Sequence, residues 1–537
     1  MATFAGESSI RGSTETIRML LLTFCTIGIT FTWGVEMTYC TPYLLSLGLS
    51  KSNTSMVWIA GPLSGLIVQP IIGVVSDENT SKWGRRRPMM VIGAVIVAIA
   101  MLVLGFTKEI VSYFIADPET AKFPTVFLAV LAIYVVDFAI NAVMSCSRSL
   151  IVDTLPIEKQ QSGAAWASRM SAIGNVVGYA GGAIDLVSIL GTTFGDTQFK
   201  LLTIIAVFAI LGATGITCWA VTEKVLLPNV RKDKAQPQSR FQVVGKIYAT
   251  ILHLPPRIRA ICWAVFWSWI GWFPFLFYST TWVGETYFRY DADESAKSGD
   301  TLGDIGRIGS QAFVLSSLIT LTASLVLPLI VKSPDEESYT QRPHPVLASV
   351  LKYCGNSRPD LLTMWICGHS LFALAMIFAP FATSYRFATT LVCLCAVPWA
   401  ISGWAPSAFL GVEVNKLASQ GGSASSYRRV PNQDIELSLL GNGGSDAPES
   451  SAELSGVYFG ILNVYTTLPQ FVGTFISMIV FAILEPGKSR ELGAGDDDNK
   501  TTTPTTTGPN AISVCLFIGA LSTLVSVFVT RKLRDLD

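Results

Sequence analysis

Twelve long apolar segments dominate this sequence and constrain its fold more than any other feature. A helix that crosses the hydrocarbon core of a membrane needs about 20 apolar residues, because each residue adds about 1.5 Å along the axis. The segments that meet this length are 18–46, 57–76, 88–107, 124–147, 162–187, 201–222, 260–283, 310–331, 362–383, 388–411, 456–484 and 511–530. They predict an all-α integral membrane protein with twelve transmembrane helices.

The composition agrees with a chain that is solvated by a lipid bilayer. Half of the 537 residues are hydrophobic and only 14% are charged, whereas a soluble domain has about 25% charged residues. The 38 Lys and Arg residues balance 38 Asp and Glu residues, so the chain lacks the basic surplus that phosphate binding needs, and nucleic acid is not expected as a partner. The ten Cys residues lie in or beside apolar segments without CxxC or Cys/His spacing, so no metal is expected.

The loops divide the chain into two groups of six predicted helices. Lys and Arg residues concentrate on the side that is cytosolic when both termini lie in the cytosol, as the positive-inside rule requires. The predicted organisation is a cytosolic N-terminus (1–17), a six-helix bundle (18–222), a cytosolic linker (223–258), a second six-helix bundle (259–530) with a disordered cytosolic insert (413–454), and a cytosolic tail (531–537).

The loop between the second and third predicted helices carries a Gly and an Asp four residues apart, followed by a basic run. These residues are Gly73, Asp77, Arg85, Arg86 and Arg87, with Pro88 directly after them. The spacing, together with six plus six helices around a long middle loop, resembles the major facilitator transporters. Asp77 and the three Arg residues are predicted to form the inner gate, since guanidinium groups pair with carboxylates and helix carboxyl termini. The alternative is a plain positive-inside run.

Charged residues inside predicted membrane helices are costly and indicate a functional site. Glu36, Asp137 and Arg169 are of this kind, and Arg148 closes the helix of Asp137. Eleven residues separate Asp137 from Arg148, so both lie on one face of the helix, about 16 Å apart. We therefore predict that this face lines a wet cavity, with Arg148 at the inner gate.

A carboxyl group at the depth of Asp137 is desolvated, which favours its protonated form until water or a hydroxylated substrate enters. Asp137 is thus the predicted main proton carrier and a substrate contact, and Glu36 is predicted to be a second acid with the same two roles. The alternatives are a structural ion pair of Asp137 with Arg148 or Arg169, and a position of Glu36 near the outer mouth.

The seventh predicted helix is rich in aromatic residues between Trp263 and Tyr278. Aromatic rings stack on the apolar faces of sugars, so Trp272 is a predicted substrate contact. An interfacial aromatic belt explains the ends of this segment but not its middle.

These features together resemble the sucrose and α-glucoside proton symporters of the glycoside–pentoside–hexuronide branch of the major facilitators. The residues that carry the resemblance are 41–43, 58–73, 83–88, 137 with 148 and 153, 174–179, 272–275 with 282–284, and 460–463 with 469–470. The resemblance implies that Asp137 acts in proton coupling and sugar binding and that Arg148 is required for transport. Glu36, Lys51 and Glu285 depart from the plant pattern and predict a fungal member, with sucrose, maltose or another glucoside as substrate.

The sequence therefore predicts a proton-coupled symporter that imports α-glucosides by alternating access and needs no cofactor besides the co-transported proton. Gln69, Asn175, Tyr179 and Asn463 are further predicted substrate contacts. No nucleophile–base set or Walker loop is present, so an enzyme is not expected. A sugar receptor without net transport, a monosaccharide or vacuolar transporter and a channel remain alternatives. The plasma membrane is the expected location, with the vacuolar membrane as the alternative, and the oligomeric state is open.

Overall fold

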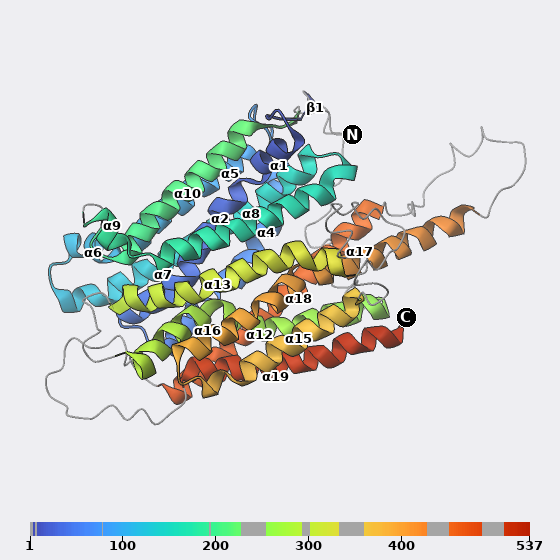
Figure 1. Cartoon of the computed structure of the whole chain (residues 1–537). Coiled ribbons are helices and arrows are strands. Elements are labelled where there is room, and N and C mark those ends of the chain that lie inside the picture. The colour runs from blue at the N-terminus through green and yellow to red at the C-terminus, as the bar shows by residue number, and fades with distance from the viewer. Residues whose placement is uncertain are drawn as a thin grey trace, which may run out of the picture.

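The computed structural model describes residues 4–5, 8–77, 79–192, 195–226, 254–292, 301–331, 359–426, 451–485 and 510–536. Structural statements below refer to these residues. Almost all of them lie in helices that run side by side along one direction (Figure 1).

The first half of the chain supplies helices that correspond to the first six predicted spans. They are α1 (Glu15–Thr23), α2 (Cys25–Ser46), α3 (Lys51–Val57), α4 (Ala60–Asp77), α5 (Arg87–Gly105), α6 (Thr107–Phe114), α7 (Pro118–Thr154), α8 (Ile157–Ala183), α9 (Leu186–Leu190) and α10 (Gln198–Ala220).

The second half supplies the other six. They are α12 (Pro256–Thr286), with a π-helical continuation η1 (Tyr287–Asp291), α13 (Thr301–Ile330), α15 (Leu361–Ile377), with the 3-10 turn η3 (Ala379–Phe381), α16 (Tyr385–Leu394), α17 (Ala396–Ser426), α18 (Ser451–Leu484) and α19 (Ala511–Lys532), followed by the 3-10 turn η4 (Leu533–Leu536).

Eleven of these helical segments are long and apolar enough to cross a membrane. The twelfth, α8, spans 27 residues but is more polar than the others. It packs against α2 of its own half and against α13 of the other half, so much of its surface faces protein rather than lipid. Together these segments make up the predicted twelve-helix fold.

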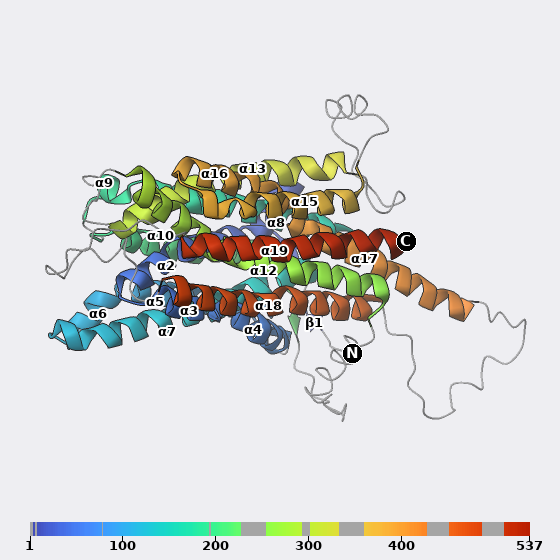
Figure 2. The same cartoon turned by 90° about the horizontal axis from the view of Figure 1, so that it is seen from below.

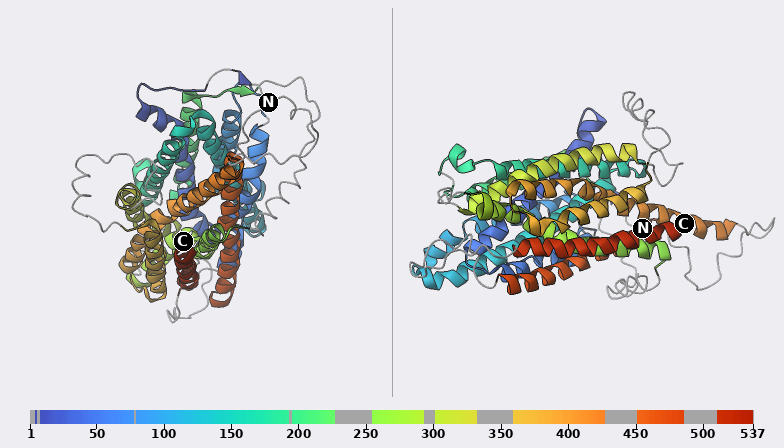
Figure 3. Two further views of the ribbon diagram at one scale, coloured as in Figure 1. Left: turned by 90° about the vertical axis from the view of Figure 1, so that its right-hand side faces the viewer. Right: turned by 60° about the horizontal axis from the view of Figure 1, so that its bottom comes forward.

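The two halves form separate bundles that lie against each other (Figure 1). The blue to green helices of the first half lie mostly above the lime-green to red helices of the second half in this view. Both termini lie at the same end of the molecule, which we call the termini end, and α6 and α9 lie at the opposite end, which we call the far end. Figure 3 shows both termini on one face when the molecule is viewed along the helices.

The outer surface of the bundle is apolar, as lipid contact requires. On α5, for example, Ile92, Ile96 and Ile99 are exposed along one side, while Met90, Val97 and Met101 on the other side are buried. Small residues allow close helix contact inside the bundle. A Cβ atom on Gly519 of α19 would lie 2.9 Å from the Cα atom of Gly271 on α12.

Four two-residue strands tie the start of the chain to the end of α10. β2 (Ser9–Ile10) pairs antiparallel with β3 (Val221–Thr222), and β1 (Phe4–Ala5) pairs antiparallel with β4 (Val225–Leu226). β1 and β2 fall within the predicted cytosolic N-terminus, β3 falls at the end of the predicted first bundle, and β4 falls at the beginning of the predicted linker. They fix both segments at the termini end.

The predicted bounds of the disordered insert, 413–454, are wrong at both ends. Helix α17 continues to Ser426 and α18 already begins at Ser451; residues 427–450 lie outside the described part of the chain. In the first turn of the extension of α17, Glu413 pairs with Arg257 at 3.3 Å and with Lys416 at 3.4 Å. Most of the linker, residues 227–253, also lies outside the described part.

Candidate functional site

Two carboxyl groups lie inside the first bundle, and no described residue forms an ion pair with either of them. Glu36 on α2 is 1% exposed and Asp137 on α7 is 4% exposed. The two groups are close enough to interact electrostatically. Neither oxygen of Glu36 and only one oxygen of Asp137 has a hydrogen-bond partner among the described residues. A buried charge without a partner is costly, so this pair is best accommodated when protonated.

Asp137 receives a hydrogen bond from the indole of Trp33, which lies one turn from Glu36 on α2. Among the described residues, Asp137 forms no ion pair with Arg148 or Arg169, so this predicted alternative is wrong. Arg169 instead lies over the ring of Trp166, 5.2 Å from its centroid. Arg148 is exposed and lies towards the termini end of the same helix. The shared face of Asp137 and Arg148 is preserved because α7 is one continuous helix.

Asn141, one turn after Asp137, links α7 to α4. Its amide nitrogen donates to the backbone oxygen of Asp137 at 2.9 Å and to the hydroxyl of Ser64 at 2.7 Å. Its carbonyl oxygen accepts a hydrogen bond from the amide nitrogen of Gln69 at 3.0 Å. The predicted contact residue Gln69 is thereby brought next to the helix that carries Asp137.

Gln69 lies on the side of α4 that faces away from lipid. Ile67 and Ile71 mark the lipid side, since both are exposed, and each is about 160° round the helix from Gln69. On the inner side, a Cβ atom added to Gly73 would meet nothing within 4 Å, and one added to Gly65 would meet only Gln69 itself. The inner face of α4 therefore has open space in front of it.

Asn463 on α18 lies on a comparable inner face of the second half. The exposed residues Val472, Phe475 and Ile479 mark the lipid side of that helix. Asn463 lies nine residues before Val472, which places it half a turn away, and yet it is exposed. A polar residue that is exposed opposite the lipid side indicates space that water can reach.

Asn175 and Tyr179 lie on α8 at the boundary between the halves. Tyr179 is mostly buried, and its ring lies 5.1 Å from the ring of Phe313 on α13. Asn175, one turn earlier, is half-buried. Both are placed where the bundles meet, but no contact joins them to Asp137 in the described residues.

The position of Trp272 corrects its prediction as a substrate contact. Its side chain is 0% exposed, with ring centroids 4.2 Å from Phe372 on α15 and 5.0 Å from Trp399. Neighbouring helices of the second half cover this ring, so no face is left for stacking on a sugar. The aromatic segment of α12 packs mainly as core.

At the termini end, the basic run binds carboxylates of its own bundle. Arg85 and Arg86 both donate to Asp153 at the end of α7, each at 2.9 Å. Arg86 also donates to Ser76 on α4. The predicted pairing of the Arg run with carboxylates is thus present, whereas the side chain of Asp77 lies outside the described residues.

Glu223, just after α10, binds the beginning of α5. It accepts hydrogen bonds from the backbone amides of Arg85, Arg86 and Arg87 at 2.6, 2.9 and 2.8 Å. An acidic side chain at a helix N-terminus satisfies free amides and the helix dipole. Gly84 precedes these amides with a φ of +108° and lies directly against Glu223.

At the far end, a buried ion-pair network joins the two halves. Lys51 of α3 is 3% exposed and lies 2.7 Å from Glu285 of α12 and 2.6 Å from Glu485 at the end of α18. Glu285 is fully buried and also accepts a hydrogen bond from Asn510 at 2.8 Å. Figure 2 shows α3 and α18 side by side. Next to them, the hydroxyl of Tyr278 donates to Ser55 at 3.2 Å.

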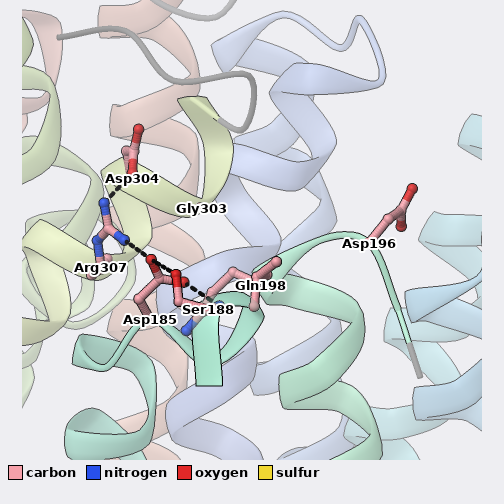
Figure 4. A pocket seen from close by; sticks show the side chains of 8 residues that line it. Asp185, Ser188, Asp196, Gln198, Gly303, Asp304 and Arg307 are labelled. Atoms are coloured by element: carbon pink, nitrogen blue, oxygen red, sulfur yellow. Dashed lines mark hydrogen bonds and ion pairs between the residues drawn. The ribbon is translucent and has the colours of Figure 1, made fainter. Parts of the chain in front are cut away.

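A second contact between the halves lies in a more open place at the far end (Figure 4). Arg307 of α13 pairs with Asp185 at the beginning of α9 at 3.2 Å and also binds Asp304. These groups line a cavity of about 240 Å³. The hydroxyl and amide of Ser188, together with Arg307, hold the pKa of Asp185 below its usual value.

Sequence reasoning missed several residues of this site. Asn141 carried a usable signal, because it is a polar residue one turn from Asp137 in an apolar segment. Trp33 carried a similar signal, one turn before Glu36. No sequence pattern indicated the partners of Lys51, because 234 residues separate it from Glu285.

Comparisons with known proteins identify relatives of the chain. The "General alpha-glucoside permease" of Schizosaccharomyces pombe is 28% identical over 98% of this chain and 95% of its own length. The "Sucrose transport protein SUC4" of Arabidopsis thaliana is 30% identical over 53% of this chain and 59% of its own length.

Solved structures of transporters share the fold. A D-xylose–proton symporter aligns with a TM-score of 0.53 and 13% identity over 95% of this chain and 97% of that one. A bacterial homologue of the lysosomal transporter Spinster, in an inward-facing conformation, aligns with a TM-score of 0.53 and 14% identity over 97% of this chain and 96% of that one. The model of the Major Facilitator Superfamily matches residues 22–301. With its twelve helices in two bundles, the chain belongs to this superfamily.

Proposed function

We propose that this protein is a proton-coupled symporter that imports sucrose, maltose or related α-glucosides by alternating access. The observation that carries the proposal is the pair Glu36 and Asp137, two buried carboxyl groups that have no cation partner among the described residues. The similarity to an alpha-glucoside permease of Schizosaccharomyces pombe and a sucrose transport protein of Arabidopsis thaliana supports the choice of sugar.

The pair gives a physical basis for coupling a proton to a sugar. Two adjacent buried carboxyls cannot both stay charged without a large cost, so at least one holds a proton when the site is dry. Water or sugar hydroxyls that reach Asp137 can stabilise its carboxylate and allow the proton to leave. Asp137 then acts as proton carrier and hydroxyl acceptor, and Glu36 acts as the second acid.

The contacts between the halves support alternating access. Lys51 and Arg307 hold the halves together at the far end, whereas Arg85 and Arg86 bind within one half at the termini end. If the termini are cytosolic, as the charge distribution predicts, the far end is extracellular and is closed in this structure. Arg148, Asp77 and the Arg run then belong to the inner gate.

The test is uptake of radiolabelled sucrose and maltose into proteoliposomes with an imposed proton gradient. The wild type should accumulate at least one of the two sugars above equilibrium, and more strongly as the outside becomes more acidic. Asp137→Asn should lose gradient-driven accumulation, since an amide cannot bind and release a proton in this range. Glu36→Gln should keep part of it, because Asp137 remains.

Other results would contradict the proposal. Unchanged concentrative uptake by Asp137→Asn would exclude this residue as the carrier. Sugar binding without flux would identify a receptor, and sugar flux without proton movement would identify a channel. Location in the plasma membrane or vacuolar membrane of the native cell would separate import into the cytosol from vacuolar transport.

A further inference from the structure

Asn141 has only one orientation that satisfies its surroundings. Its side-chain nitrogen donates to the backbone oxygen of Asp137 and to Ser64. A backbone carbonyl can only accept hydrogen bonds. A flipped Asn141 would place its own carbonyl oxygen against that of Asp137, and two buried acceptors would face each other without a proton between them.

The orientation of Asn141 in turn fixes that of Gln69. Because the carbonyl oxygen of Asn141 faces α4, Gln69 must present its amide nitrogen to it, as the 3.0 Å hydrogen bond shows. The carbonyl oxygen of Gln69 then points away from Asn141. Among the described residues no donor binds this oxygen, and the side chain is only half-buried.

This free oxygen lies on the inner face of α4. The lipid side of the helix is on the opposite side, at Ile67 and Ile71. Open space lies over Gly73, one turn after Gln69, and over Gly65, one turn before it, a Cβ atom would meet only the amide nitrogen of Gln69, at 4.0 Å. The chain of hydrogen bonds that ends at Gln69 begins at the backbone of Asp137, so the acceptor is anchored to the residue that carries the proposed proton.

We propose that Gln69 presents a fixed, non-titrating hydrogen-bond acceptor to one hydroxyl of the transported sugar, and that Asn141 is the positioning residue that sets this polarity. The inference rests on the proposed sugar transport and deepens it. The sugar must donate a hydrogen bond at that hydroxyl, and a group that only accepts is rejected there at every proton occupancy of Asp137.

The test uses analogues altered at single positions of the glucosyl unit that sucrose and maltose share. A monodeoxy analogue lacks the hydroxyl, whereas a monodeoxyfluoro analogue keeps a weak acceptor but cannot donate. Each analogue competes with the labelled sugar that the wild type accumulates. At one position, both analogues should compete about fivefold less well than the parent sugar, because the loss of one neutral hydrogen bond weakens binding by about this factor. We call this loss of competition the penalty at that position.

In Gln69→Leu, the penalty at that position should disappear while penalties at other positions remain. Asn141→Leu should weaken the same penalty alone, because Gln69 is then free to rotate. Ser64→Ala is the matched control: the Asp137 carbonyl still fixes Asn141, so the penalty should persist. This pattern is specific to hydrogen-bond polarity, and a general loss of packing would not produce it.

Two results would overturn the inference while leaving sugar transport intact. One is a fluoro analogue that competes as well as the parent sugar at the position sensitive to Gln69, which would make Gln69 a donor. The other is a full set of penalties that Gln69→Leu leaves unchanged. If the wild type accumulates neither sugar, the proposed function itself fails, and the inference fails with it.

Discussion

At the scale of single residues, the acidic side chains of the first bundle fall into two kinds. Asp153 and Glu223 lie at the termini end and bind Arg side chains or helix amides. Glu36 and Asp137 are buried inside the bundle, and within the described part of the chain neither forms an ion pair. The first kind holds structure together, because a paired carboxylate gains from staying charged. The second kind is suited to exchange a proton, because its charge is not compensated.

The contact of Glu223 with the beginning of α5 depends on the backbone conformation of Gly84, and a substitution at Gly84 tests this dependence. A Cβ atom at Gly84 would lie 2.6 Å from a carboxylate oxygen of Glu223, and its φ of +108° is unfavourable for any other residue. We expect Gly84→Ala to destabilise the protein by about 1–3 kcal/mol. The measurement is thermal unfolding of the purified protein in detergent.

Gly212→Ala on α10 is the matched control for this prediction. Gly212 lies in a helix, and a Cβ atom there would meet nothing within 4 Å. Its replacement should change stability by no more than about 1 kcal/mol, in the favourable direction that helix propensity gives. Equal unfolding temperatures for the two Ala variants would show that the Glu223 contact does not depend on Gly84.

At the scale of elements, the sequence predicts the helices well and their contacts poorly. Apolar length locates the spans because the membrane requires it, and the common face of Asp137 and Arg148 follows from helix geometry alone. The prediction for Trp272 fails because an aromatic-rich sequence does not reveal which rings α15 and α17 cover. The end of α17 is also missed, because the helix continues past the apolar segment, where Glu413 forms ion pairs with Arg257 and Lys416.

Lys51 joins α3 to α12 and α18 in a way that only the folded structure reveals. In Lys51→Met, the fully buried Glu285 would lose a positively charged partner that lies 2.7 Å away. Removing one partner of a buried ion pair costs about 3–5 kcal/mol. We expect a large loss of thermal stability in the closed arrangement, partly restored in the double variant with Glu285→Gln, which removes the buried charge that Lys51 balanced.

An exposed pair of the same chemistry provides the comparison. Lys122 pairs with Glu119 at 2.6 Å, but both side chains are largely exposed. Such surface pairs contribute at most about 1 kcal/mol, so Lys122→Met should unfold close to the wild-type temperature. If Lys51→Met behaved like Lys122→Met, the network at the far end would not hold the halves together.

At the scale of the whole molecule, the two contacts between the halves differ in their surroundings. The Lys51 network is buried, whereas Asp185 and Arg307 border an open cavity at 45% and 32% side-chain exposure (Figure 4). A transporter must separate these contacts once in each cycle. If the charged groups of these contacts titrated within the working pH range, the pH dependence of transport would report both the opening of the far end and proton coupling.

Asp185 allows these two sources of pH dependence to be separated. Its pKa is lowered by Ser188 and Arg307, so its contribution to closure is present above the usual pKa of an Asp. That contribution is lost only as the pH falls through the lower value of the folded protein. From neutral to mildly acidic pH the Asp185–Arg307 contact therefore stays constant. Asp185→Asn should change the rate of sugar uptake by the same factor at every pH in this range.

The measurement is the ratio of initial uptake rates of Asp185→Asn and wild type across a pH series. A flat ratio leaves the interior pair Glu36 and Asp137 as the source of the pH dependence, as the proposed mechanism requires. Asp137→Asn should instead give a ratio that changes with outside pH, because the proton carrier itself is lost. A ratio for Asp185→Asn that varied in parallel would show that the far-end contact titrates during transport, and coupling could then not be assigned to the buried carboxyls alone.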